Sequence, residues 1–167
     1  MHDIRPADQH DLAQLIAAAA DSPAAREHHR ERWTRQARGE ALYLLARADG
    51  AIVGHTMLLR GSKYAAVRAA HNPAEINALH AYEQGRGIGT ALIAAAESLA
   101  ADWGRDLVGL AVEPQNTGAR RLYERLGYRQ WDGGQVLDEW TEKDAAGQVI
   151  VAHQDPGVYL LKPLTAS

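Results

Sequence analysis

Hydrophobic and polar positions in the first quarter of the chain predict one strand followed by two helices. Residues 4–7 are typical of a short edge strand, which the proline within it ends. A helix follows, capped by Asp8 or Asp11, because apolar residues recur at helical spacing at Leu12, Leu15, Ile16 and Ala19. A second helix begins at Ser22-Pro23, a frequent helix start, and runs to about Arg38.

The next segment predicts a hairpin and a further strand. Residues 41–47 and 52–59 are apolar runs joined by Asp49-Gly50, a dipeptide that favours a tight hairpin turn. Residues 61–73 form a polar connection with no clear period. Residues 76–82 then read as a strand.

Helix and strand patterns alternate in the third quarter of the chain. Residues 90–103 carry an apolar stripe at helical spacing, and Gly104 is a natural C-terminal cap. Residues 107–112 are nearly all apolar, as in a strand that is buried on both faces. A short helix over 117–126 and a strand over 128–131 follow.

The C-terminal segment is polar and rich in turn residues. Residues 132–156 allow a hairpin with Ala146-Gly147 at its tip, and residues 158–161 predict a final strand. The whole order of elements predicts an α/β (α+β mixed) fold on one mixed sheet, in a single domain over residues 1–167.

Composition excludes several classes of function. The net charge is −3 and no basic block is present, so nucleic acid is not expected as a partner. The absence of cysteine excludes disulfides, thiolate catalysis and cysteine metal sites. The N-terminus lacks the apolar core of a signal peptide and no window approaches transmembrane length. We therefore expect a cytoplasmic protein without a membrane partner.

A glycine-rich segment before the helix at 90–103 is the most informative local feature: Gln84-Gly85-Arg86-Gly87-Ile88-Gly89-Thr90. Alternate glycines let the backbone turn and approach a ligand closely, while the unpaired N–H groups of the helix face the loop. This arrangement favours a phosphate or pyrophosphate, although a plain strand-to-helix turn is the simpler alternative. The segment fails as a dinucleotide fingerprint, since Thr90 stands at the third glycine, and it lacks the lysine of a P-loop.

A second feature follows the apolar strand at 107–112. Asn116 and Tyr123 are seven positions apart, so they share one face of the predicted short helix. That face lies at the carboxyl end of the sheet core, where ligands of open α/β sheets gather. Taken singly, Asn116 is more simply a helix cap and Tyr123 a packing residue.

Together the two segments resemble the GCN5-related N-acetyltransferase (GNAT) superfamily. Residues 84–89 match its acetyl-CoA signature, which is Gln or Arg, two residues, Gly, any residue, then Gly or Ala. Asn116 with residues 119–128 resembles the second signature of the family. The resemblance implies a central mixed, mostly antiparallel twisted sheet flanked by helices on both faces. It also implies acetyl-CoA as co-substrate, no metal, and direct acetyl transfer to a primary amine.

The resemblance also implies roles for individual residues. Tyr123 would protonate the departing thiolate and Asn116 would bind the pantetheine amide, while a strand N–H would stabilise the oxyanion. Cofactor contacts are implied for Leu79, His80, Ala81, Gln84, Gly85, Arg86, Gly87, Ile88, Gly89, Thr90, Asn116, Ala119 and Tyr123.

Glu75 is the implied general base, because an ammonium group must lose a proton before it attacks. The alternative is a solvated or capping glutamate just ahead of the strand at 76–82, and His80 and Glu83 are weaker candidates for the base. The chain is about two residues shorter before Gln84 than many relatives, which leaves the register of the strand open.

The acceptor is expected to be a small amine. The alternatives are acetylation of a protein N-terminus or lysine, and a catalytically inactive CoA-binding sensor. Pairing of C-terminal strands allows a homodimer.

Other polar side chains are given no role in the reaction. His28-His29 are expected on a solvated helix face, and His55 is expected to be an ordinary strand residue. An acidic stretch beside Trp140 is a weaker candidate for contact with a cationic acceptor: Asp138, Glu139, Glu142 and Asp144.

Overall fold

The computed structural model describes residues 2–165; residue 1 and residues 166–167 of the expected domain lie outside the described part. The strands are β1 (Asp3–Pro6), β2 (Ala41–Ala48), β3 (Ala51–Leu59), β4 (Ala74–Ala81), β5 (Leu107–Val112), β6 (Arg129–Gln130), β7 (Val136–Lys143) and β8 (Val149–Pro163). The helices are α1 (Gln9–Ala18), α2 (Pro23–Ala37), α3 (Ala65–Ala70), α4 (Ile88–Asp102) and α5 (Thr117–Arg125).

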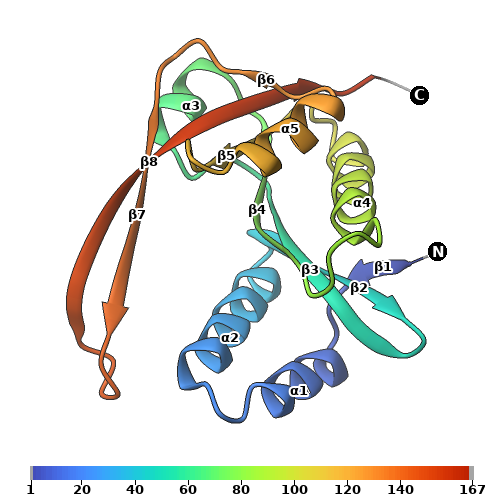
Figure 1. Ribbon diagram of the computed structural model, residues 1–167, viewed down its shortest axis with the longest axis vertical. Helices are drawn as coiled ribbons and strands as arrows, with labels where there is room; N and C mark the ends of the chain where they lie inside the picture. Colours follow the sequence, from blue (N-terminus) through green and yellow to red (C-terminus); the bar gives the residue numbers. More distant parts are fainter. Residues whose placement is uncertain (1, 166–167) are drawn as a thin grey trace.

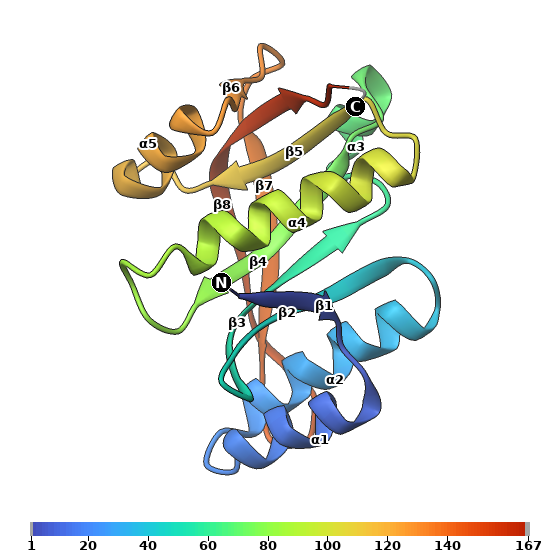
Figure 2. The ribbon, with the colours of Figure 1, turned by 90° about the vertical axis from the view of Figure 1, so that its right-hand side faces the viewer.

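One mixed eight-stranded sheet organises the molecule, in the order β1-β2-β3-β4-β5-β8-β6, with β7 paired to β8 alone (Figure 1). Within the described chain only β4 and β5 pair in parallel, and the other strand pairs are antiparallel. The predicted mixed, mostly antiparallel sheet is therefore confirmed. Figure 2 shows α4 lying across strands β4 and β5 of the twisted sheet.

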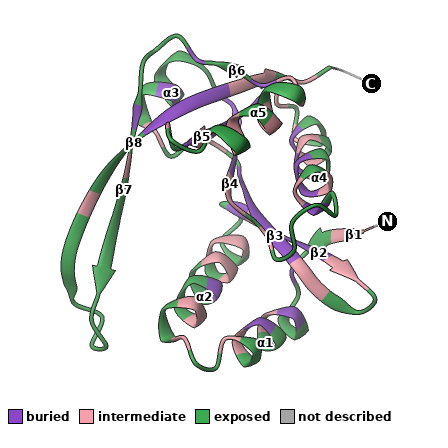
Figure 3. Cartoon of the chain, in the orientation of Figure 1, coloured by how far each residue is buried: buried purple, intermediate pink, exposed green. Residues whose placement is uncertain are grey.

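Helices cover both faces of the sheet, as predicted, because alternate residues of each strand point to opposite sides. Leu44 and Ala46 of β2 belong to the core beneath α4, whereas Tyr43 and Leu45 pack in a second core with Leu15 of α1. Burial is concentrated in β2–β5 and the end of β8, as Figure 3 shows in purple.

Local capping signals set the starts of the first two helices where the sequence predicts them. Asp8 and Asp11 form a reciprocal capping box, since each side chain accepts a hydrogen bond from the other's backbone N–H. Ser22 caps α2 by accepting from the N–H of Ala25 at 3.2 Å, and Pro23 occupies the first turn.

The structure departs from the expected elements in two places. The connection at 61–73 contains the short helix α3, and β8 begins at Val149 instead of residue 158. The turn near Ala146-Gly147 is confirmed as the tip of the β7–β8 hairpin, which projects from the body (Figure 1). Most of the projecting half is exposed on both faces, so the one-sided alternation of a half-buried strand is missing.

Strand β4 parts from β5 soon after it begins. The two strands pair only at Ala74↔Val108 and Glu75↔Gly109 within the described chain. On its other edge β4 takes one extra residue against β3 between Asn77 and His80, a bulge, and Ala78 adopts φ +52°. This bulge settles the open register: β4 bends there and leaves a fork between itself and β5.

Gly109 lets a tyrosine cross β5 at the apex of this fork. The Tyr159 hydroxyl on β8 donates a hydrogen bond at 2.8 Å to Oε1 of Glu75 on β4, two strands away. A Cβ on Gly109 would lie 2.2 Å from that hydroxyl, so only glycine leaves room for the ring.

We expect Gly109→Ala to displace Tyr159 and lower the free energy of unfolding by about 1–3 kcal/mol, as overpacking does. Urea denaturation measures this loss. Gly61→Ala is the matched control, since a Cβ there meets nothing within 4 Å and the backbone φ is ordinary. Equal stability of the two variants would contradict the close approach of Tyr159.

Candidate active site

The fork between β4 and β5 opens into a cavity of about 430 Å³. Leu79 lines it from β4, Leu110 from β5, and Asn116 and Tyr123 from the start and middle of α5. The hairpin β7–β8 closes another side with Trp140. We call this space the fork cavity; it brings Asn116 and Tyr123 of the second motif together with Glu75 and Leu79 of β4.

The glycine loop leads from the end of β4 into α4. Gly85 and Gly87 have positive φ of 77° and 73°, and Gly87 is the N-terminal cap residue of α4. Because glycine has no side chain, nothing caps the first turn of α4, and the N–H groups of Ile88 to Thr90 remain open to a ligand. The loop is exposed, and the Nε of Arg86 lies 2.8 Å from an oxygen of Glu83. A helix dipole and free amides thus meet at one point, which suits an anion.

Asn116 and Tyr123 both face the fork cavity. Oδ1 of Asn116 accepts from the N–H of Ala119 at 3.1 Å, so Asn116 is a helix cap and its side-chain NH₂ is left for a ligand. Tyr123 is half-buried between α5 and the core, and burial raises the pKa of its hydroxyl. The hydroxyl therefore stays protonated at neutral pH and can act as a proton donor.

Glu75 occupies the closed end of the fork cavity and is only 1% exposed. Oε1 accepts hydrogen bonds from the hydroxyls of Ser62 at 2.6 Å and Tyr159 at 2.8 Å, and Oε2 accepts from the N–H of Lys63 at 3.1 Å. Burial raises the pKa of Glu75 even though these donors oppose it. The expectation of a solvated or capping glutamate ahead of the strand is wrong, since Glu75 lies inside β4.

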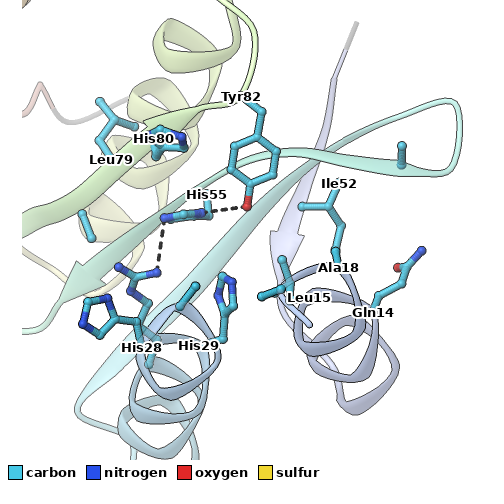
Figure 4. Close-up of a pocket in the computed structure, with 15 residues that line it drawn as sticks. Gln14, Leu15, Ala18, His28, His29, Ile52, His55, Leu79, His80 and Tyr82 are labelled. Atoms are coloured by element: carbon cyan, nitrogen blue, oxygen red, sulfur yellow. Dashed lines mark hydrogen bonds between the residues drawn. The ribbon is translucent and has the colours of Figure 1, made fainter. Parts of the chain in front are cut away.

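A second cavity, of about 680 Å³, lies between helices α1 and α2 and strands β3 and β4 (Figure 4). We call it the imidazole cavity, because four histidines line it: His28, His29, His55 and His80. Ala78 and Leu79 line both cavities, so the two spaces meet at the bulge of β4.

Sequence reasoning missed most of this second cavity. His29 and His55 are buried, so the solvated-face prediction fails for His29 and holds only for the exposed His28. Nδ1 of His29 lies 2.7 Å from the Tyr43 hydroxyl, and Nδ1 of His55 lies 3.0 Å from that of Tyr82. The available signal was His80-x-Tyr82, because a period of two puts both rings on one face of an extended chain.

The remaining predicted cofactor residues do not all face the same side of the sheet. Ala81 and Ala119 pack against the core beneath α4, whereas the side chain of His80 faces the imidazole cavity. Leu79 packs against that core as well as lining both cavities. The His80 side chain therefore lies outside the fork cavity.

The sequence profile of the acetyltransferase (GNAT) family matches residues 9–128, which include the fork, the glycine loop and α5. The chain belongs to this family. An uncharacterized N-acetyltransferase of Mycobacterium bovis is 35% identical over 88 residues, 52% of this chain and 51% of that protein. The matched segment thus spans about half the length of this curated relative.

Solved structures of the family share the whole fold. The yncA protein of Salmonella typhimurium, solved with its cofactor acetyl-CoA, is 18% identical and superposes with a TM-score of 0.64 over 99% of this chain and 95% of that one. The PaiA N-acetyltransferase of Thermoplasma acidophilum, in complex with coenzyme A, is 18% identical with a TM-score of 0.62 over 98% and 99%. At this level of identity the likeness establishes the GNAT fold alone.

Two further observations bear on the surroundings of the site. Among residues 2–165 no helix has the length and apolar character needed to cross a bilayer. Over the same residues no three His, Asp or Glu side chains gather as a metal-binding group.

We expect Gly87→Ala to weaken CoA binding about tenfold, because alanine at φ 73° costs about 1–2 kcal/mol or shifts the loop amides. Calorimetric titration with CoA measures the change. Gly39→Ala is the matched control: its φ is 75° and a Cβ there meets nothing within 4 Å, but it lies between α2 and β2. A similar loss of CoA affinity in both variants would refute a role for the loop geometry.

Proposed function

We propose that the protein is an acetyl-CoA-dependent N-acetyltransferase that transfers the acetyl group directly to the primary amine of a small molecule. The observation that carries this proposal is the fork between β4 and β5. The glycine loop at the end of β4 leads into the N-terminus of α4, which has no side-chain cap, and Tyr123 lies on the wall of the fork cavity.

Three groups of acetyl-CoA would find partners in and beside the fork: the pyrophosphate, the extended pantetheine chain and a pantetheine carbonyl. The open amides of residues 88–90 and the loop glycines would hold the pyrophosphate, with Arg86 as a counter-charge. The pantetheine would lie along β4, where the backbone beyond Glu75 has lost its β5 partner and can pair with an added extended chain. The side-chain NH₂ of Asn116 would hold a pantetheine carbonyl.

The reaction needs an oxyanion donor and an acid. Amine attack on the thioester carbon puts negative charge on the carbonyl oxygen, which a backbone N–H of β4 near Leu79 would stabilise. As the C–S bond breaks, Tyr123 would give its proton to the sulfur, whose conjugate thiol has a pKa of about 8.5. The raised pKa of Tyr123 keeps that proton available at neutral pH.

The amine must reach the thioester uncharged, which calls for a base. We assign this role to Glu75, because a raised pKa makes its carboxylate a better proton acceptor than an exposed glutamate. Oε2 accepts a single hydrogen bond from Lys63 in the described structure, which leaves a lone pair for the amine or a bridging water.

The dimensions of the site favour a small acceptor. The imidazole cavity of about 680 Å³ lies within the range of small-molecule sites, and it meets the fork at Ala78 and Leu79. An acceptor in this cavity would approach the thioester from the side opposite α4.

We expect Tyr123→Phe to lower kcat by about 10²–10⁴-fold while CoA binding stays within a few fold, because only the proton donor is lost. Release of free CoA in the presence of amines measures turnover. Tyr128→Phe is the control; its hydroxyl donates to Glu97 at 2.8 Å and takes no part in the site. Full activity of the Tyr123 variant would remove this residue from the mechanism, and acetyl-CoA that fails to bind at all would refute the proposed function.

We expect kcat/KM to fall on acidification through a pKa above the usual glutamate value of about 4.3, since the base must be ionised and burial raises the pKa of Glu75. Glu75→Gln should lose this limb of the pH–rate profile. Ser62→Ala should move the limb to higher pH, because the Ser62 hydroxyl stabilises the carboxylate. A limb that stays fixed in the Ser62 variant would assign it to another group.

A further inference from the structure

Charge is distributed unequally between the two cavities that meet at Ala78 and Leu79. The fork cavity is lined by four carboxylates, Glu75, Glu113, Asp138 and Asp155, and by one cation, Lys63, whose Nζ pairs with Asp138. No Asp or Glu is among the described residues that line the imidazole cavity. Its permanent charge is the guanidinium of Arg32 on α2.

Arg32 is held at the cavity wall by aromatic neighbours instead of by a carboxylate. Its Nη1 lies 3.4 Å from Nε2 of His55, and its guanidinium lies 5.8 Å from the centre of the Tyr43 ring. None of the ion pairs within residues 2–165 involves Arg32. A half-buried guanidinium with five N–H donors therefore keeps donors for a ligand.

The histidine that bonds to Arg32 is neutral. Arginine has no acceptor atom, so Nε2 of His55 must accept the bond from Nη1, and its Nδ1–H must then donate to the Tyr82 oxygen (Figure 4). Burial and the charge of Arg32 agree with this state, since they lower the pKa of His55 to about 3. The chain of bonds leaves the O–H of Tyr82 without a fixed acceptor, free to donate into the cavity.

We propose that the acceptor is an amine that also carries a carboxylate, as in an amino acid. Its carboxylate would pair with Arg32 and accept from the Tyr82 hydroxyl, and its amine would point toward Leu79 and the acidic fork. One guanidinium, the only permanent charge among the described residues that line this cavity, matches a single negative charge, whereas a phosphate dianion would call for a second cation. This inference rests on the proposed acetyl transfer and adds to it the class of acceptor.

The test compares amines in matched pairs that differ only in the carboxylate, such as phenylalanine with phenethylamine and leucine with isoamylamine. We expect the wild-type protein to favour the carboxylate member of at least one pair in kcat/KM. Arg32→Gln should reduce this preference about 10- to 100-fold, mainly through KM, and leave the decarboxylated amine nearly unchanged.

Arg35→Gln serves as the matched control. Arg35 lies one turn further along α2, pairs with Glu40 at 3.5 Å, and does not line either cavity. The substitution should leave the carboxylate preference intact. A change of the same size in both variants would show an effect of net charge and overturn the assignment to Arg32.

Binding of each amine to the complex with CoA, measured by calorimetry, gives a second readout without turnover. Wild-type protein that treats both members of every pair alike, or that prefers the decarboxylated member, would overturn the inference. So would a preference for O-phosphoethanolamine over every carboxylate-bearing amine. Failure to bind acetyl-CoA or CoA would instead refute the underlying function, so the two failures are distinguishable.

Discussion

The divergence of β4 from β5 is the constraint on which the site depends. A β-sheet interior normally pairs every backbone N–H and C=O group, and unpaired groups away from water are costly. Here β4 and β5 share only two residue pairs, because the bulge at Ala78 turns β4 away. The open edges along 76–79 and 110–112 line the fork cavity. An extended ligand with amide groups, laid between these edges, would supply the missing hydrogen-bond partners, which supports the proposed binding of pantetheine there.

The apex of the fork is fixed by a buried carboxylate and its donors. Glu75 accepts hydrogen bonds from Ser62 and Lys63, which lie just ahead of α3, and from Tyr159 on β8. Such a network holds the apex in place only while all its members are satisfied, since a buried polar group without a partner is costly. The raised pKa of Glu75 shows that burial outweighs the donors. Because the same burial raises the pKa of Glu75, one side chain can belong to this hydrogen-bond network and also fit the base that we propose.

Much of this arrangement was predictable, because its signals are local. Caps at Asp8 and Ser22 and the glycines at 85–89 are determined by a few consecutive residues, and they agree with the structure. Helix α3 was missed because six residues carry little periodicity and Tyr64 supplies no side-chain cap. The hydrogen-bond partners of Glu75 could not be predicted for another reason. Ser62 and Tyr159 are 13 and 84 positions away in the sequence, so their contact with Glu75 depends on the assembled sheet. The contact of His55 with His80 likewise depends on the bulge, which no pattern of residue types predicts.

Two parts of the chain contribute side chains to the walls of these cavities. The segment that matches the family, residues 9–128, contains the glycine loop, Asn116 and Tyr123, and all the residues that line the imidazole cavity. The β7–β8 hairpin lies beyond it, yet contributes Asp138 and Trp140 to the wall of the fork cavity. The matched segment thus supplies Arg32, Glu75 and Glu113, whereas two of the four carboxylates of the fork cavity, Asp138 and Asp155, come from the hairpin outside it. Because Ala78 and Leu79 line both cavities, a change in the hairpin alters the charge of the fork cavity without altering the wall that the two cavities share.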